Sequence, residues 1–357
     1  MMIQIPIRQL ILMLASMVAL MFVGSTLMFD PNGTCENEPN HHMPKSNTFG
    51  LAYQGERFLL FLLLISCCAA SNLQNFIGLL AILWSILLLV YGYGDTRYVA
   101  KKFAACHFLA LIFCACADIL SKNMGRHTGA TVLHILGFGL LVPIYPLSSW
   151  IDSFFSRAPS LFLSTWLVII RPVIVSFFLS TPGLLVSTGE NTSINFLLYI
   201  MVYGTLGFVP ILFFTKTRLR TLAAYMTCWQ SGYIWLFTMR LPTVKFDTVM
   251  LLAITQGIFM AIIAQVTTAL YKRAKTDSLK NLEGLFETNY FAAIFMMSAM
   301  VFLTITPLIF IYKKNMPPLP HAFVYQILAS MALPIIFNLK IYKLMAKSSP
   351  KPDKISS

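Results

Sequence analysis

The sequence predicts an all-α polytopic membrane protein, a bundle of about ten transmembrane helices with a count between eight and eleven. Of its 357 residues, 57% are hydrophobic and 11% are charged, whereas charged residues make up about 25% of an ordinary soluble domain. The apolar runs are continuous rather than alternating. Because a chain in hydrocarbon must satisfy its own backbone hydrogen bonds, continuous runs indicate helices and not the strands of a barrel.

The chain begins with residues 1–29, which we expect to form a first span or signal anchor. A single Arg8 precedes an apolar run over residues 9–29. This run is longer than the 7 to 15 residues of a signal-peptide core, which favours a retained span. Residues 30–57 form a polar loop rich in Pro, Asn and Gly, and it carries a glycosylation sequon at Asn32.

Residues 58–93 leave the span count open. They are almost uninterruptedly apolar, and as one helix they would be about 54 Å long, against about 30 Å of hydrocarbon. One strongly tilted helix would give ten spans and place the loop 30–57 in the lumen. A hairpin broken at the polar residues 71–75 would give eleven spans and place that loop in the cytoplasm.

Eight further apolar stretches complete a membrane domain that we assign to residues 58–345. They cover residues 103–121, 131–149, 161–183, 195–215, 222–239, 249–271, 290–312 and 321–345. Residues 346–357 are polar and contain two prolines, and we expect them to form a disordered cytoplasmic tail.

The distribution of Lys and Arg predicts the orientation. Alternate loops contain 14 and 6 of these residues, and the richer set should be cytoplasmic; it comprises residues 94–102, 150–160, 216–221, 272–288 and the tail. A second sequon at Asn191 then lies in the lumen, so we expect a glycoprotein of the endoplasmic reticulum. Topology and contacts with membrane lipids account for the net charge of +13 without a nucleic-acid partner.

The sequence indicates neither a metal nor a cofactor. It has seven cysteines without a C-x-x-C pair, and six of them lie in apolar stretches where a thiol behaves as a small hydrophobe. The aspartate-rich motifs that hold a metal diphosphate, the Walker A loop, H-E-x-x-H and G-x-S-x-G are all missing from the sequence.

Ionisable residues inside spans are costly and are therefore candidates for function. Asp118 is the one carboxylate within a predicted span. It is a candidate catalytic acid, because burial favours the protonated form, or else a residue that reaches the interface or pairs with Arg171. Arg171 precedes Pro172, and it either acts at the site or caps backbone that the proline leaves unbonded. His107 and His134 are interpreted as packed core residues. For His134 the alternative is a place in a substrate-binding site.

Two aromatic and polar patches supply further candidates. Residues 142–146 contain two prolines, which fits a helix broken at the mouth of a cavity or an interface anchored by Trp150; Asp152 follows as a second candidate acid. Trp229, Gln230 and Trp235 are candidate substrate-binding residues, because aromatic faces stabilise cations. Ordinary helix packing explains the same residues.

Two sequence patterns carry a family resemblance. Gly207-Phe208-Val209-Pro210 followed by Trp229-Gln230, and residues 140–145 upstream, resemble the G-Y-x-x-P … W-Q-x-x-P and hydrophobic-P-L-Y segments of a fungal family encoded with secondary-metabolite pathways. That family includes the membrane-bound terpene cyclases of ascofuranone-type meroterpenoid pathways and accessory membrane proteins of indole-diterpene pathways of the paxilline and lolitrem type. The resemblance covers about residues 130–240, and it departs from the family where Gly232-Tyr233 replaces the second proline.

The resemblance implies a cofactor-independent terpene cyclase of fungal secondary metabolism. Asp118 or Asp152 would protonate the epoxide of a lipophilic, prenylated substrate, and Trp229 and Trp235 would stabilise the resulting cation. The alternative is a non-catalytic membrane protein that anchors other pathway enzymes or transports a lipophilic intermediate. A receptor, suggested by residues 333–338, fits the span count poorly.

Overall fold

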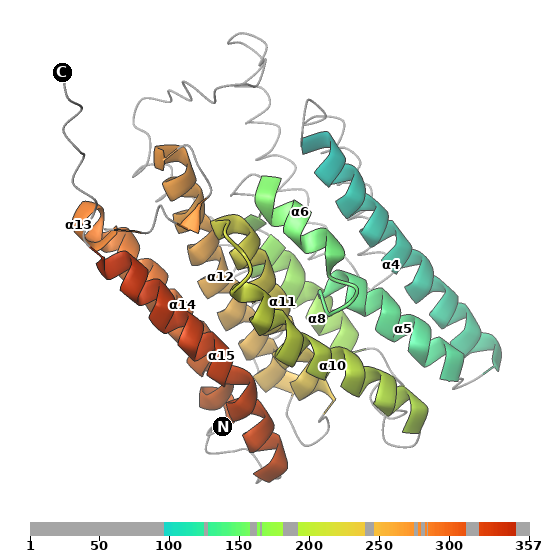
Figure 1. Ribbon diagram of the computed structural model, residues 1–357. Coiled ribbons are helices and arrows are strands. Elements are labelled where there is room, and N and C mark those ends of the chain that lie inside the picture. Colours follow the sequence, from blue (N-terminus) through green and yellow to red (C-terminus); the bar gives the residue numbers. More distant parts are fainter. Residues whose placement is uncertain are drawn as a thin grey trace, which may run out of the picture.

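A computed structural model describes residues 96–124, 128–157, 163–164, 166–180, 192–239, 246–274, 278–279, 283, 285–311 and 321–347. Its elements are helices arranged side by side (Figure 1). They are α4 (Thr96–Met124), α5 (Thr128–Leu141), α6 (Ser149–Arg157), a π-helical turn η1 (Trp166–Ile170), α8 (Arg171–Ser180), α10 (Thr192–Phe213), α11 (Leu219–Thr238), α12 (Phe246–Ala274), α13 (Leu285–Thr288), α14 (Tyr290–Ile311) and α15 (His321–Ala346). The predicted all-α membrane bundle is confirmed.

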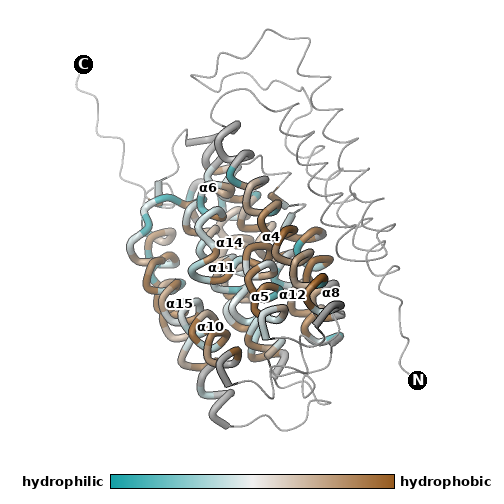
Figure 2. The backbone as a smooth tube through the Cα atoms, turned by 90° about the vertical axis from the view of Figure 1, so that its right-hand side faces the viewer, coloured by the Kyte–Doolittle hydropathy of each residue, from teal (hydrophilic) through white to brown (hydrophobic). Residues whose placement is uncertain are grey.

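Four helices in the described part are long and apolar enough to cross a membrane. The stretches are Phe196–Phe213, Asp247–Leu270, Tyr290–Ile309 and Ile327–Ala346, and Figure 2 shows hydrophobic residues along much of the helical bundle. The chain is therefore a multi-pass integral membrane protein. The predicted first span, the loop 30–57 and the stretch 58–93 lie outside the described residues, so the total of ten spans stays a prediction.

One predicted span is broken. Residues 131–149 were predicted as one span, with a break at the prolines of residues 142–146 as one interpretation. In the structure α5 ends at Leu141 and α6 begins only at Ser149. Pro143 and Pro146 lack the N–H that a helix requires, and the Tyr145-Pro146 peptide bond is cis. The helix breaks where these two prolines make the α-helical ladder impossible.

Neighbouring helices satisfy the backbone of this break. The indole N–H of Trp150 donates to the Leu140 carbonyl at 2.9 Å and that of Trp235 donates to the Val142 carbonyl at 3.2 Å. The Tyr145 N–H donates to the Thr205 hydroxyl at 2.9 Å. Irregular backbone is tolerated at membrane depth where protein supplies such partners. Trp150 is buried, so its predicted role as an interfacial anchor is wrong.

Helix α11 forms the centre of the bundle. Apart from Arg220 and Tyr225, its residues are buried, and it packs against α6, α10 and α12. It also bonds to α14 and α15, since Gln230 donates to the Leu303 carbonyl and the Tyr233 hydroxyl meets that of Ser330. A helix enclosed by protein can carry polar side chains that lipid would exclude, which explains why α11 is less apolar than α10 and α12.

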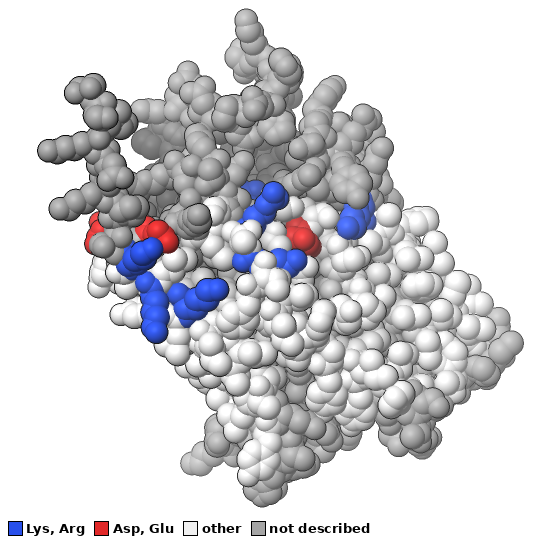
Figure 3. Space-filling model, viewed as in Figure 1, with Lys and Arg blue, Asp and Glu red and all other residues white. Residues whose placement is uncertain are grey.

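The loops richest in Lys and Arg meet at one end of the bundle, here called the basic end. Along it, Lys102 bonds to Ser149 and Ser153, and Arg220 bonds to the Ser156 carbonyl. The Leu279 N–H donates to the Thr217 carbonyl, and Lys347 pairs with Glu283 at 3.4 Å. Figure 3 shows the described Lys and Arg, together with the described Asp and Glu, in a band at the upper margin of the described surface, whereas the rest of the described surface on this face is free of charge. The side of the membrane that this end faces stays a prediction.

Candidate functional site

The most unusual residue in the described core is Arg171, which opens α8 directly after the π-helical turn η1. Pro172 has no N–H to donate to the carbonyl of Val168, so the α-helical ladder is interrupted here. The turn before it widens to π geometry, a distortion often found at functional sites. The sequence therefore places a cation at a defect in a membrane helix.

Arg171 is fully buried, with 0% of its surface exposed. Its Nη2 donates to the Ser231 hydroxyl of α11 at 3.0 Å and, more weakly, to the Gln256 Oε1 of α12 at 3.5 Å. Ser231 in turn donates to the Thr227 carbonyl, so its oxygen is oriented to accept from the guanidinium. We call Arg171, Ser231 and Gln256 the arginine cluster; it joins three helices through neutral polar partners.

The arginine cluster is incompletely satisfied. Arg171 Nε, Arg171 Nη1 and Gln256 Nε2 are buried and have no hydrogen-bond partner among the described residues. Because Gln256 Oε1 accepts from Arg171, its amide is oriented with Nε2 as the spare donor. A buried charge without a counter-charge is costly by several kcal/mol, so these spare donors mark a place where a ligand would be stabilised.

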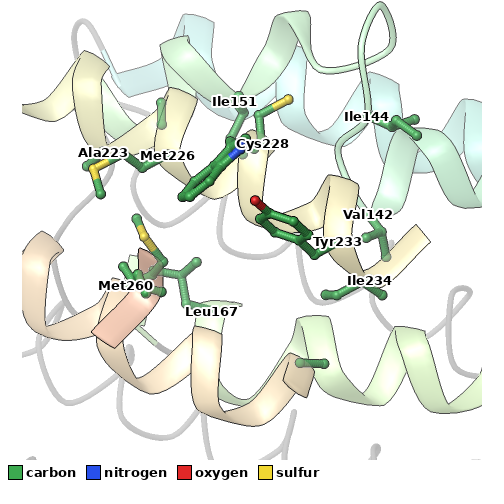
Figure 4. Close-up of a cluster of buried hydrophobic side chains, with 14 of the residues drawn as sticks. Val142, Ile144, Ile151, Leu167, Ala223, Met226, Cys228, Tyr233, Ile234 and Met260 are labelled. Atoms are coloured by element: carbon green, nitrogen blue, oxygen red, sulfur yellow. The ribbon is translucent and has the colours of Figure 1, made fainter. Parts of the chain in front are cut away.

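Tight packing holds the arginine cluster in place. Gly257, next to Gln256, lies so close to η1 that a Cβ there would collide with the Leu167 carbonyl oxygen. The missing side chain lets α12 approach the π-helical turn. Figure 4 shows buried side chains of this region, among them Leu167 of η1, Cys228 of α11 and Met260 of α12.

Asp118 and His134 form a second polar pair. His134 Nε2 lies 3.1 Å from Asp118 Oδ1, with 8% and 32% of the two side chains exposed. The pair joins α4 to α5. The expectation that Asp118 pairs with Arg171 is wrong, because the hydrogen bonds of Arg171 reach α11 and α12 instead.

Asp152, the other candidate acid, lies far from this pair. It is half-buried in the first turn of α6, where Lys102 of α4 bonds to neighbouring Ser149 and Ser153. Asp118 is 16 residues beyond Lys102 on the same helix, which corresponds to about 24 Å. The two carboxylates are therefore near opposite ends of the bundle and cannot serve one site together.

Trp229, Gln230 and Trp235 share a helix but not a site. The Trp229 ring packs against Phe213 of α10, and its N–H has no partner among the described residues. Gln230 donates to the Leu303 carbonyl of α14. Trp235 packs on Phe178 of α8 and bonds to Val142 in the α5–α6 break. These three side chains contact different neighbours around α11.

Of the predicted site residues, the arginine cluster contains only Arg171. Sequence reasoning missed Ser231 and Gln256, because it considered ionisable groups first and both are neutral. A glutamine within the long apolar run 249–271 was the available signal. The predicted glycosylation sites Asn32 and Asn191 lie outside the described residues. Within the described residues, no group of three His, Cys, Asp or Glu side chains could hold a metal ion.

The fold is similar to that of chains in large membrane complexes. No protein-family model and no curated protein sequence match this chain. A chain of the membrane-bound sulfane sulfur reductase, an archaeal respiratory membrane complex, is 13% identical with a TM-score of 0.64, covering 84% of this chain and 69% of that one. A chain of respiratory complex I from Thermus thermophilus with bound aureothin is 14% identical with a TM-score of 0.60, covering 95% of this chain and 84% of that one. A chain of the Mrp complex from Dietzia sp. is 14% identical with a TM-score of 0.62, covering 97% of this chain and 77% of that one.

The suggested membership of a fungal terpene-cyclase family is wrong. The solved structures of similar fold come from respiratory and Mrp complexes, and no family model supports the fungal family. Packing explains the residues behind the resemblance: Pro210 lies inside α10, Pro143 lies in the α5–α6 break, and Trp229 and Gln230 are core residues of α11. At this level of identity the comparisons show the fold alone.

Proposed function

We propose that this chain is a membrane-embedded subunit of a larger complex and that it moves a polar or charged solute across the bilayer. The observation that carries the proposal is the fully buried Arg171 with its spare donors. Ionisable residues inside a membrane bundle are costly and are by default candidates for solute pathways and charge relays. The fold is also that of chains found in multi-protein membrane complexes.

The arginine cluster favours a polar solute over the lipophilic intermediate that the sequence suggested. A purely apolar molecule would gain nothing from a guanidinium, an amide and a hydroxyl, and would leave all of them unsatisfied. The helix defects near this region, η1 and the α5–α6 break, resemble in kind the discontinuous helices that carry binding sites in transporters.

Flux through reconstituted protein tests this proposal. In proteoliposomes, gradients of protons, sodium, potassium or chloride should drive a current in at least one case, and Arg171→Gln should reduce that current at least tenfold. Arg218→Gln is the matched control, because Arg218 is exposed in the turn before α11 and its loss should leave the current unchanged. Absence of flux with every ion, or flux that survives Arg171→Gln, would contradict the proposal.

A second candidate function is a purely structural subunit that anchors partner proteins. The similarity to chains of multi-subunit assemblies favours it as well. For both candidate functions we expect the protein to have an apparent mass well above that of one chain after extraction from native membranes with a mild detergent. They differ in flux, which the structural subunit should lack.

The endoplasmic reticulum as its membrane remains a separate proposal. It rests on the sequons at Asn32 and Asn191, since only lumenal acceptors are glycosylated. A mass shift on glycosidase treatment that is abolished by Asn191→Gln would support it, and a shift abolished by Asn32→Gln would also support one crossing over residues 58–93.

A further inference from the structure

We propose that the arginine cluster is a binding site for one small inorganic anion of chloride size, held between α8, α11 and α12. The inference builds on the proposed transport role by naming the class of solute, but binding can be tested without transport. The charge of Arg171 and the unpartnered donors of the cluster favour an anion.

The first step is the charge balance around Arg171. Its described hydrogen-bond partners, Ser231 and Gln256, are neutral. Among the described carboxylates, Asp118 is bonded to His134 and Glu283 to Lys347, while Asp152 and Glu287 belong to α6 and α13, outside the three helices of the cluster. Asp247 lies nine residues before Gln256 on α12, about 13 Å along the helix. The described part of the bundle thus leaves the guanidinium without a contacting anion, and a bound anion would neutralise it.

The second step is the chemistry of the unpartnered groups. Arg171 Nε, Arg171 Nη1 and Gln256 Nε2 are all donors, while the two acceptors of the cluster, Ser231 Oγ and Gln256 Oε1, are already used by Nη2. A set of donors around a fixed positive charge recognises an anion and repels a cation. The donors of a guanidinium and an amide cannot supply the oxygen ligands that a metal cation requires.

The third step is the size of the ligand. The cluster is completely buried, and Gly257 brings α12 against η1. The apolar Leu167 lies one turn before Arg171, and the apolar Met260 lies one turn after Gln256. Figure 4 shows both of these apolar side chains. These surroundings fit a halide or nitrate and not an organic acid or a lipid headgroup.

Binding is tested on the purified full-length chain in detergent. Equilibrium dialysis with radioactive chloride should give one bound ion per chain. Exchanging gluconate for chloride or bromide at constant ionic strength should raise the midpoint of thermal unfolding by about 3 °C at a hundredfold excess over Kd. Arg171→Gln should abolish both effects.

Gln256→Glu provides the sharper variant, because it guards against a simple failure of Arg171→Gln to fold. A carboxylate at this position lies next to the guanidinium and should replace the bound anion. We expect a higher unfolding midpoint than the wild type in gluconate and no response to chloride. Gln265→Glu is the matched control, since Gln265 is exposed on the same helix; this variant should keep the chloride response.

The outcomes separate this inference from the transport proposal. No bound chloride and no anion-dependent shift in the wild type would overturn the anion site, and so would a chloride response that survives Gln256→Glu. Bound chloride without flux in proteoliposomes would support the site and overturn transport. Flux of protons or sodium without chloride binding would support transport and overturn the site.

Discussion

At the scale of single residues, several polar side chains inside the described bundle tie neighbouring helices together. Asn338 donates to the Thr304 hydroxyl at 2.8 Å and ties α15 to α14. This asparagine belongs to residues 333–338, which suggested a receptor, and its contact is one of helix packing. Hydrogen bonds between membrane helices are individually worth only about 1 kcal/mol. Arg171 stands apart from such residues, because it carries a charge and keeps unused donors.

The Asp118–His134 pair should contribute measurable coupling. We expect a double-mutant cycle with Asp118→Asn and His134→Ala to give a coupling energy of about 1 kcal/mol, reduced from that of a buried charged hydrogen bond because Asp118 is partly exposed. Thermal unfolding in detergent measures it. Asp152→Asn combined with His134→Ala should give a coupling near zero, since these residues lie near opposite ends of the bundle. Equal coupling in the two cycles would contradict the assigned pair.

At the scale of elements, the helices divide into those fixed by local sequence and those fixed by distant partners. The apolar runs 249–271, 290–312 and 321–345 predicted α12, α14 and α15 to within three residues at either end, because polar residues flank each run. For the α5–α6 break, the two prolines of residues 142–146 indicated a broken helix as one interpretation, but the partners that satisfy its backbone were not predicted. Its hydrogen-bond partners Trp150, Trp235 and Thr205 lie between 10 and 93 residues away along the chain, and no local pattern reveals such pairing.

The break makes a prediction about two tryptophans of α11. Trp235→Phe removes the N–H that satisfies the Val142 carbonyl and leaves a buried acceptor unpaired. Trp229→Phe removes an N–H that has no partner in the described structure. Both rings are buried, so the change in packing is similar. We expect Trp235→Phe to lower the free energy of unfolding by about 1–3 kcal/mol more than Trp229→Phe, measured by unfolding in detergent. A larger loss for Trp229→Phe would show that the break is stabilised in another way.

The candidate site was predictable only in part, for a related reason. A charge in an apolar run is visible in the sequence, and it identified Arg171 and Asp118. The partners of a charge depend on which helices meet, and neutral Ser231 and Gln256 resemble many other polar residues of membrane helices. Trp229, Gln230 and Trp235 of α11 were expected to bind one substrate, whereas three-dimensional packing directs them to α10, α14 and the α5–α6 break.

At the scale of the whole molecule, charge asymmetry organises the bundle. Loops between residues 96 and 347 that the Lys and Arg count grouped together contact one another at the basic end. Lys216 lies 4.5 Å from the ring centroid of Tyr225 there. Such a surface suits the anionic cytoplasmic leaflet.

Labelling of introduced cysteines in sealed membrane vesicles tests this orientation. Thr217 is exposed at the basic end, and Ser121 is exposed near the other end of α4, about 28 Å beyond Lys102. We expect a membrane-impermeant maleimide to label Thr217→Cys only from the cytoplasmic side and Ser121→Cys only from the opposite side, above the background of the natural cysteines. The reverse pattern would invert the topology. It would also remove the reason for placing Asn191 in the lumen, because residues 184–194 belong to the loops opposite the basic end.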